Sequence, residues 1–581
     1  MMLEHISPEV IIHILHYSEY PTILRFAATC KAYYALVAQS TSLQLHIELE
    51  SNGLELVKGS FKRDATYSVI LEDLRRFRDA WLNLKIDHPI VRPLGSPDML
   101  LWELREGFYV KGFSRSGGNH ADTLQFIPLD AKSPDPPPLA FHFSFNEFTV
   151  DPAQGLVAVL SRDNDLQSTI HIQLCSSTTG LAHPLAQYPK LTIEFDSGRR
   201  VSVSHFALEI MGDLLLTRVS RNPTHVYEVL IWNWKSGLFL TRISSNMGIC
   251  DTFFLDRQHL VLQAATRSSQ LQTHLDTLAL LVYVIPDSNP TYNASSHQYL
   301  KVADLLVSQP ILRLAFPQIN NAFTVSVNGF ILHSDPVPGR ILYAKSAAFS
   351  CSYATTLGIA FSFRSVNRGW DEPPYYRVFV DGRFLLDQIH TNANVHGETR
   401  VLPWASWGIY ATRWFISSFA PDHWVSWMSG SKFLMASPHP PYHCVFDFSV
   451  IQGRPTEPQT KGCGHEMGVK WLESDIHRIA EGPMPGNGLT SITVGVGSPN
   501  VFCRDAGLAF DELIESRLPY RLAFRRLTNM NHEGLQIVGD CMVGVNTWGP
   551  GSESITIYKL EGETASGEIQ LSRDLALLSC A

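Results

Sequence analysis

The stretch "VYEVLIWNWKSG", residues 226–237, is the part of the sequence that best indicates the fold. Its centre is a continuous apolar run from Val229 to Trp232, and it ends in a polar turn at Gly237. A short apolar run bounded by turn signals is typical of a β-strand. With its tryptophans and its closing turn, this stretch looks like the outer part of a WD-like propeller blade.

The same kind of unit recurs along the chain. One strand type is an apolar run after a turn, as in "GLVAVLSRDN" from Gly155, "GDLLLTRVSRN" from Gly212 and "DRQHLVLQAATRSS" from Asp256. A second strand follows each, as in "TIHIQLCSSTTG" and "LALLVYVIPDSN". Looser copies are "LGIAFSF" with "YYRVFVDG", and "DCMVGVNTWG" with "ESITIYKLEG". Several short strands repeating about every 50 residues predict propeller blades.

A propeller also limits the number of exposed strand edges. We therefore expect residues 93–581 to form a β-propeller-like domain of seven or eight blades, with a pair of β-sandwiches as the alternative. A strand near Trp102 to Gly112 should close the ring by pairing with the last strand, near Ile555 to Leu560.

The N-terminal part has the spacing of helices instead. Ser7 and Pro8 form a helix-start signal, with Ser7 as the capping residue, and apolar residues follow on one helical face. A longer helix is predicted from Ser68 to Leu84, where one stripe holds Ile70, Leu74, Phe77, Trp81 and Leu84. The expected fold class is thus α plus all-β, with a helical domain at residues 1–50 and a helical linker at residues 51–92.

Composition narrows the class of protein. Hydrophobic residues make up 45% of the chain and charged residues 17%, as in a packed globular protein. The net charge of -9 argues against a nucleic-acid binder. Nine scattered cysteines without a C-x-x-C pair indicate reduced thiols. With no signal-peptide pattern and no membrane-length apolar run, we expect a cytoplasmic or nuclear protein without membrane contact.

The first 36 residues resemble the F-box pattern L-P-x-E-[IL]-[LI]-x-x-I-[LF]-x-[YH]-L, D-L-L-R, V-C-[KR]. The matching residues are Ile6, Pro8, Glu9, Val10, Ile11, Ile14, Leu15, Tyr17, Ile23, Leu24, Arg25, Cys30, Lys31, Tyr33 and Leu36. Ser7, Ser18, Thr22 and Thr29 depart from it. The rest, through "RDAWLNL", "LLWELREGFYVKG" and "NEFTVDPAQGLVAVLSRDN", is similar to fungal F-box proteins with a long β-rich tail.

This resemblance implies a non-catalytic adaptor of an SCF-type cullin ubiquitin ligase, without cofactor or metal. The F-box would dock on a Skp-type linker and, through it, on a cullin, while the β-rich domain holds an unidentified target protein close to the conjugating enzyme. The residues implied in linker docking are Ile6, Pro8, Ile11, Leu15, Ile23, Leu24, Cys30, Tyr33 and Leu36. The pattern alone fits a helix of the chain's own core equally well.

Target binding is expected in an insert that a blade does not need. The segment from Ser365 to Tyr376 carries the residue types enriched at binding hot spots, namely Arg368, Trp370, Tyr375 and Tyr376. A second insert runs from Ile451 to Gly468. The tryptophans that crowd one short stretch are expected to fill blade cores; they are Trp404, Trp407, Trp414, Trp424 and Trp427.

Motifs of catalysis are missing from the sequence. It has no P-loop, no H-E-x-x-H helix and no G-x-S-x-G elbow. Cys463, His465 and His477 do not have the spacing of a metal site. Two alternatives to the ligase adaptor stay open. One is a propeller enzyme such as a glycoside hydrolase, although Asp371 and Glu372 are adjacent rather than a facing pair. The other is an F-box scaffold outside the ligase.

Overall fold

Most of the chain is placed in a computed structural model. The residues that it describes are 6–62, 65–86, 88–95, 98–130, 134–162, 168–195, 205–221, 225–288, 299–343, 346–353, 355–366, 375–391, 398–417, 428–438, 441–449, 489–502, 509–526, 532, 534–539, 541–546 and 553–560.

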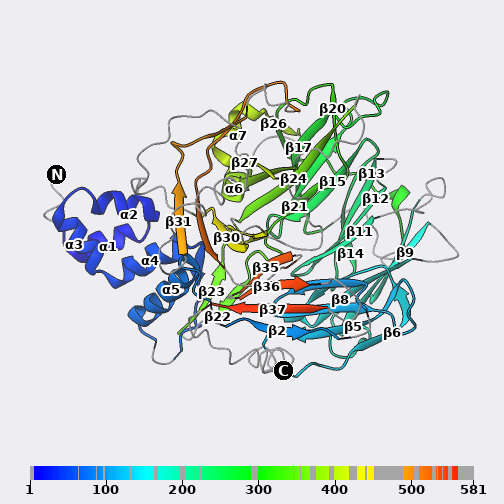
Figure 1. Cartoon of the computed structure of the whole chain (residues 1–581), viewed down its shortest axis with the longest axis horizontal. Coiled ribbons are helices and arrows are strands. Elements are labelled where there is room, and N and C mark those ends of the chain that lie inside the picture. The colour runs from blue at the N-terminus through cyan, green and yellow to red at the C-terminus, as the bar shows by residue number, and fades with distance from the viewer. Residues whose placement is uncertain are drawn as a thin grey trace.

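Helices make up the N-terminal part, as expected, and they form a unit beside a β-rich body (Figure 1). They are α1 (Pro8–Leu15), α2 (Tyr20–Ala27), α3 (Lys31–Gln39), α4 (Thr41–Ser51) and α5 (Tyr67–Leu82). Pro8 lies in the first turn of α1, but the Ser7 side chain makes no capping bond to the backbone. The first four helices share one apolar cluster, so they pack as a single small unit, the helical unit (residues 8–51).

The β-rich body contains seven sheets of four or five strands within the described residues. Sheet 1 holds β3 (Leu101–Arg105), β4 (Phe108–Phe113), β5 (Ala121–Pro128) and β6 (Leu139–Phe145). Sheet 2 holds β7 (Glu147–Asp151), β8 (Leu156–Arg162), β9 (Thr169–Ser176), β10 (Lys190–Glu194) and β18 (Tyr299–Lys301). Sheet 3 holds β11 (His205–Met211), β12 (Leu214–Arg221), β13 (Val226–Asn233) and β14 (Leu238–Ser245). Sheet 4 holds β15 (Gly248–Phe254), β16 (His259–Thr266), β17 (Thr277–Val284), β19 (Leu312–Ala315) and β26 (Arg400–Leu402).

The remaining sheets follow in chain order. Sheet 5 holds β20 (Phe323–Val325), β21 (Ile331–His333), β24 (Thr356–Ser365), β25 (Tyr375–Asp381) and β27 (Thr412–Ser417). Sheet 6 holds β28 (Met428–Ser429), β29 (Lys432–Pro438), β30 (Pro441–Asp447), β31 (Leu489–Val494) and β34 (Tyr520–Arg526). Sheet 7 holds β35 (Gly534–Val538), β36 (Cys541–Asn546), β37 (Ser554–Lys559) and, from the other end of the chain, β2 (Ile90–Pro93).

The apolar repeats of the sequence are the second and third strands of these sheets, as the sequence predicted. Leu156, Leu214 and Leu260 lie at or near the start of β8, β12 and β16, and the strand after each is β9, β13 and β17. These strands lie inside their sheets, pair antiparallel with both neighbours, and are mostly buried. Burial on both faces explains why they read as continuous apolar runs.

Each sheet packs against the next through one apolar cluster. Separate clusters join sheets 1 and 2, 2 and 3, 3 and 4, 4 and 5, 5 and 6, and 6 and 7. A seventh cluster joins sheet 7 to sheet 1, with Val543 and Ile555 on one side and Leu104 and Tyr109 on the other. The contacts between the sheets therefore run in a closed cycle.

The cycle is closed by a strand other than the one expected. Strand β2, from the segment predicted to be a helical linker, pairs antiparallel with β37, and Figure 1 shows this blue strand beside the red ones of the C-terminal region. The strand near Trp102 instead pairs with β4 inside sheet 1, so its prediction as the closing strand is wrong. A buried ion pair spans the closure, with Lys111 Nζ 2.8 Å from Glu553 Oε2.

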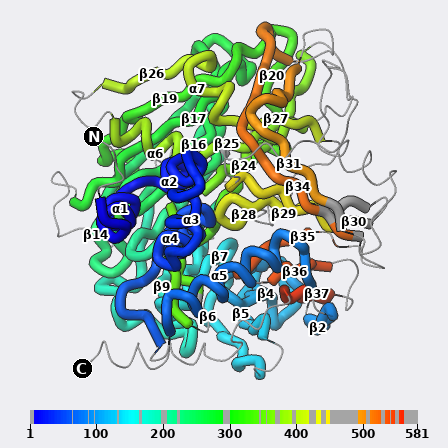
Figure 2. Tube along the Cα trace, turned by 90° about the vertical axis from the view of Figure 1, so that its left-hand side faces the viewer, coloured from blue at the N-terminus to red at the C-terminus, as the bar shows by residue number. Residues whose placement is uncertain are grey.

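The helical unit is held to the body by hydrogen bonds as well as by packing, and it lies in front of the sheets in Figure 2. Strand β1 (Leu54–Leu56), directly after α4, pairs with β23 (Ala348–Cys351), which pairs with β22 (Ile341–Tyr343). Helix α5 packs its N-terminal half near β1 and its C-terminal half, with Trp81 and Leu84, over sheets 6 and 7. None of the helices in the described part is long and apolar enough to cross a membrane.

Candidate functional site: the exposed face of the helical unit

The residues that match the F-box pattern divide into buried and accessible ones. Ile11, Leu15 and Ile23 are buried in the core of the helical unit, where they pack with Ala27, Val37 and Leu43. Ile6, Leu24, Tyr33 and Leu36 are half-buried, and Pro8 and Cys30 are exposed. The first three can therefore influence docking only by shaping the unit, whereas the others can contact a partner directly.

Two of the accessible residues also support their own helices. The Cys30 Sγ accepts a hydrogen bond from the Tyr33 N–H at 3.5 Å and so caps α3. The Tyr33 ring stacks on Phe26 with ring centroids 4.3 Å apart, which joins α3 to α2. Substitutions at these positions would change helix packing as well as any contact with a partner.

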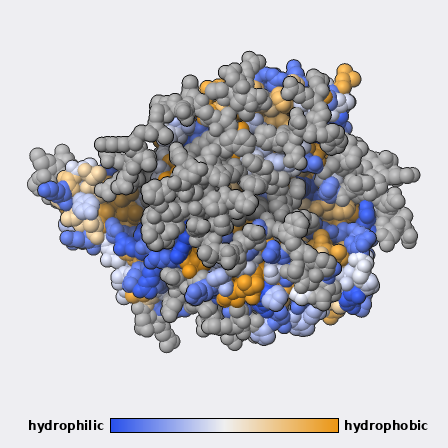
Figure 3. Space-filling view, viewed as in Figure 1, coloured by the Kyte–Doolittle hydropathy of each residue, from blue (hydrophilic) through white to orange (hydrophobic). Residues whose placement is uncertain are grey.

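A stripe of large apolar side chains remains exposed on α1 and in the turn that follows it. Val10 is 49% exposed, Ile14 is 53% exposed and Tyr17 is 82% exposed. Val10 and Ile14 lie one turn apart on α1, roughly 100° around the helix from the buried Ile11 and Leu15. Tyr17 follows in the turn after the helix ends at Leu15. Tyr34 is also largely exposed on α3. Figure 3 shows hydrophobic surface on the helical unit at the left of the view.

The chain does not cover this stripe with its own described residues, although the core of the helical unit is already filled. Burying a side chain the size of Val or Ile contributes about 1.5–3 kcal/mol, so a partner that covers the stripe gains several such contributions. Contiguous exposed apolar side chains are a feature of interaction sites. We call Val10, Ile14 and Tyr17 the α1 stripe. Sequence reasoning did not single it out as the contact surface.

Charges at the start of α1 stay ionised. The Glu9 carboxylate accepts from its own backbone N–H at the helix start and from the Ser7 hydroxyl, and both interactions lower its pKa. The α1 stripe therefore begins beside a negative charge. Arg25 on α2 and Lys31 on α3 are exposed cations on the neighbouring helices.

The orientation of the helical unit is fixed by a buried carboxylate. Glu48 of α4 is almost fully buried, and both its oxygens lie 2.7 Å from the Arg78 guanidinium of α5. Arg75 adds a longer contact of 3.7 Å, and the Asn52 side chain donates to Glu48 Oε1 at 3.2 Å. Removing one partner of a buried ion pair costs more than the pair itself contributes, so this site resists separation of α4 from α5.

The expected target-binding residues do not form a described site. Arg368 and Trp370 lie outside the described residues, as do the insert at Ile451 to Gly468 and the Asp371–Glu372 pair. Tyr375 is half-buried in β25.

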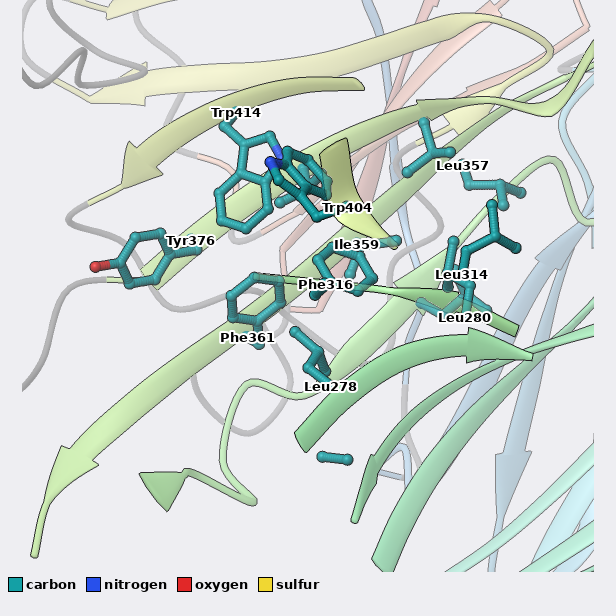
Figure 4. Packing of buried hydrophobic residues seen from close by; sticks show 14 of the residues in the cluster. Leu278, Leu280, Leu314, Phe316, Leu357, Ile359, Phe361, Tyr376, Trp404 and Trp414 are labelled. Carbon is teal, nitrogen blue, oxygen red and sulfur yellow. The ribbon is translucent and has the colours of Figure 1, made fainter. Parts of the chain in front are cut away.

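Tyr376 is only 3% exposed, and its ring stacks on Phe361 at 5.6 Å inside the cluster between sheets 4 and 5 (Figure 4). This burial conflicts with a contact role for Tyr376.

The tryptophans behave as the sequence predicted where they are described. Trp404, Trp407 and Trp414 are buried in the cluster between sheets 4 and 5, and Trp404 and Trp414 appear together in Figure 4. Helix α7 (Trp404–Ala411) places the first two, and β27 places the third. Trp424 and Trp427 lie outside the described residues.

No metal-binding group of three His, Cys, Asp or Glu side chains occurs among the residues that the structure describes. Cys463, His465 and His477 are not among them.

The sequence matches no protein-family model and no curated protein. Solved structures similar to the chain include the WD40 domain of SCAP from fission yeast, with 10% identity, a TM-score of 0.28, and coverage of 82% of this chain and 99% of that one. A eukaryotic initiation factor has 11% identity, a TM-score of 0.28 and coverage of 82% and 86%. The protein lmo1340 from Listeria monocytogenes EGD-e has 8% identity, a TM-score of 0.28 and coverage of 62% and 82%. Similarity at this TM-score supports no conclusion about fold or function.

Proposed function

We propose that the chain is a non-catalytic adaptor of an SCF-type cullin ubiquitin ligase. The helical unit acts as the F-box and docks on a Skp-type linker through the α1 stripe, and the linker connects it to a cullin. The β-rich body, a closed propeller of seven blades, holds the target protein. The observation that carries the proposal is the α1 stripe, three large apolar side chains left in water on a unit that already has a complete core.

The attachment of the helical unit supports the same role. A ubiquitin ligase adaptor works by proximity, which requires that the target stays within reach of the conjugating enzyme. The Glu48–Arg78 contact and the pairing of β1 with β23 hold the docking unit and the body in one arrangement. The proposal of seven blades rests on the closed cycle of sheet contacts and on the β2–β37 closure.

A pull-down with a purified Skp-type linker tests the docking surface. Ile14→Asp with Tyr17→Asp places two carboxylates in the interface, and binding should fall at least about 100-fold because each buried apolar side chain contributes about 1.5–3 kcal/mol. Leu271→Asp is the matched control, since Leu271 is 97% exposed on the β16–β17 connection, outside the helical unit. Wild-type binding by the double variant would refute the docking assignment.

Co-purification separates the alternatives. A ligase adaptor brings both linker and cullin, whereas an F-box scaffold outside the ligase brings the linker without the cullin. A glycoside hydrolase needs two facing carboxylates free to act on substrate. Near the centre of the body, Asp251 already accepts from Arg218 and from the Leu332 N–H, and Glu103 accepts from Thr149 and the Val150 N–H. Hydrolysis of glycosides by the full-length protein would favour the enzyme.

A further inference from the structure

Four consecutive sheets bring an acidic side chain to the centre of the β-rich body. Glu103 lies on β3, Glu147 on β7, Glu209 on β11 and Asp251 on β15, the first strands of sheets 1 to 4. Strand β7 contacts both β3 and β11, and β15 contacts sheet 3. Glu147 interacts electrostatically with Glu103, and Glu209 with Asp251, which makes two carboxylate pairs. Arg218 interacts with both Glu147 and Glu209 and so links the two pairs.

Two arginines lie among these carboxylates. Arg105 Nη1 is 3.3 Å from Glu103 Oε1, and Arg105 Nη2 also donates to the Ile210 carbonyl on β11 of sheet 3. Arg218 Nη1 is 2.6 Å from Asp251 Oδ1 and also donates to the Cys250 carbonyl. Arg105 thus joins its own strand to sheet 3, and Arg218 joins sheet 3 to β15 of sheet 4.

The other two carboxylates have only neutral donors. Glu147 accepts from the Phe148 N–H at 3.0 Å, and Glu209 accepts from the Thr252 hydroxyl at 2.8 Å. Neither forms an ion pair with any residue that the structure describes. Asp251 is buried and the other three carboxylates are half-buried. If all four were ionised, two guanidinium groups would face four negative charges with restricted access to water, which is unfavourable.

The remaining charged groups around Glu147 do not correct this imbalance. Asp151 lies at the other end of β7 and binds Gln154, His205 is exposed at the start of β11, and Arg162 ends β8. Burial raises the pKa of Glu147 to about 8, with Glu103 adding to the effect, and raises the pKa of Glu209 to about 7. Burial also raises the pKa of Glu103 in spite of Arg105.

We infer that the axial cluster, formed by Glu103, Glu147, Glu209 and Asp251 with Arg105 and Arg218, is a proton-binding site that makes the packing of sheets 1 to 4 depend on pH. With a proton on Glu147 and one on Glu209, two carboxylates remain for two guanidinium groups. Loss of those protons leaves like charges facing one another across strands of four sheets, and the sheets pack less tightly.

The direction of the pH effect follows from linkage between proton binding and folding. An unfolded glutamate loses its proton near its ordinary pKa of 4.5, whereas Glu147 and Glu209 keep theirs up to about 8 and about 7 in the folded protein. Between these values the native state binds more protons than the unfolded state, so the contribution to stability falls as pH rises from 4.5 to 8.

Thermal unfolding of the full-length protein from pH 6.5 to pH 8 tests the inference. The wild-type Tm should fall over this range. The Glu147→Gln/Glu209→Gln variant, which imitates the protonated side chains, should lose most of that slope and exceed wild type at pH 8. Glu72→Gln is the matched control, because the Glu72 side chain is 64% exposed on α5, and this variant should keep the wild-type slope.

A second measurement can be made on the wild-type protein, so it does not depend on a variant that might fail to fold. Wild-type protein unfolded with urea in weakly buffered solution at pH 7.5 should release protons, and Glu147→Gln should release fewer. An unchanged Tm slope in the double variant, or unfolding of the wild type without proton release, would overturn the inference.

Discussion

The helical unit leaves Val10, Ile14 and Tyr17 exposed, whereas the centre of the β-rich body gathers the half-buried carboxylates of Glu103 and Glu147 and the buried carboxylate of Asp251. The first arrangement costs little within the chain, because exposed apolar side chains on one short helix do not disturb a core that is already packed. The second places guanidinium groups against two of the carboxylates, and the protons that we infer on Glu147 and Glu209 balance the rest. Exposed apolar surface can be buried by a binding partner, while buried charges can fix how sheets align.

The largest effect is expected when a buried charge in the β-rich body is left without its partner. Lys111→Met removes the ammonium group that contacts Glu553 Oε2 at the closure between sheets 7 and 1. Glu553 would then be buried without a cation, and the free energy of unfolding should fall by about 3–5 kcal/mol. Urea unfolding followed by circular dichroism measures this.

Lys235→Met is its matched control. Lys235 pairs with Asp213 at 2.7 Å, but both side chains are more than a third exposed. Exposed pairs contribute about 0–1 kcal/mol, so this variant should stay close to wild type. Equal losses in both variants would mean that the closure pair has no special role.

Two neighbouring residues of α1 test the same difference within the helical unit, because Leu15 is buried and Ile14 is exposed. Leu15→Ala removes a buried side chain, and the free energy of unfolding should fall by about 2–5 kcal/mol if the site cannot collapse. Ile14→Ala acts on the exposed stripe and should change it by less than about 0.5 kcal/mol while weakening linker binding. Thermal unfolding should therefore detect the loss of stability in Leu15→Ala, and calorimetry should detect the weaker linker binding of Ile14→Ala. If Ile14→Ala destabilised the unit as much as Leu15→Ala does, the stripe would be part of the core.

A smaller effect on stability is expected from two histidines at the contact between sheets 6 and 7. Its dependence on pH is opposite to that of the axial cluster. Burial lowers the pKa of His443 to about 3 and that of His532 to about 4, and His532 Nε2 lies 2.7 Å from the Tyr558 hydroxyl. Below pH 6.5 the unfolded histidines bind protons that the native ones do not, so their contribution to stability is lost as pH falls. At about 1.4 kcal/mol per pH unit, His443 accounts for roughly 2 kcal/mol between pH 6.5 and pH 5.

Because the carboxylates and the histidines change stability with pH in opposite directions, stability should have a measurable maximum. The axial carboxylates lose stability as pH rises above 4.5 and the histidines lose it as pH falls below 6.5, so stability should be greatest between these values. Urea unfolding of Glu147→Gln/Glu209→Gln isolates the histidine contribution, and adding His443→Phe should reduce the remaining acid slope. A slope unchanged by His443→Phe would contradict this assignment, and exposed His13→Gln serves as the control.

The interior strands of the sheets could be predicted because burial on both faces forces a continuous apolar pattern, as in β8, β12 and β16. The first strands could not be read in this way, since β3, β7 and β11 carry Glu103, Glu147 and Glu209. The closing strand β2 has only four residues and its exposure alternates, so it gives almost no signal. Its partner β37 lies more than 400 residues away, and local pattern contains no information about such a pairing.

The proposed docking face could not be predicted from the sequence, for a different reason. Helix α1 carries apolar residues on two sides, and helical spacing alone cannot tell which side faces the core. The resemblance to the F-box pattern selected Ile11 and Leu15, which proved to be buried, and did not separate them from Ile14. The division between the two stripes depends on how α2 to α4 pack on α1, which is a tertiary property.

The pairing of Ile90 with Ile557 also constrains how the protein is made. Strand β2 leaves the ribosome early but cannot complete sheet 7 until nearly the whole chain has been synthesised. At about 5–20 residues per second, this wait lasts tens of seconds. During that time the sheets already formed have an open end, and a premature stop before β37 would make the open end permanent. An unpaired strand edge of this kind is a template for aggregation, so we expect nascent and truncated chains to depend on chaperones more than the finished protein does.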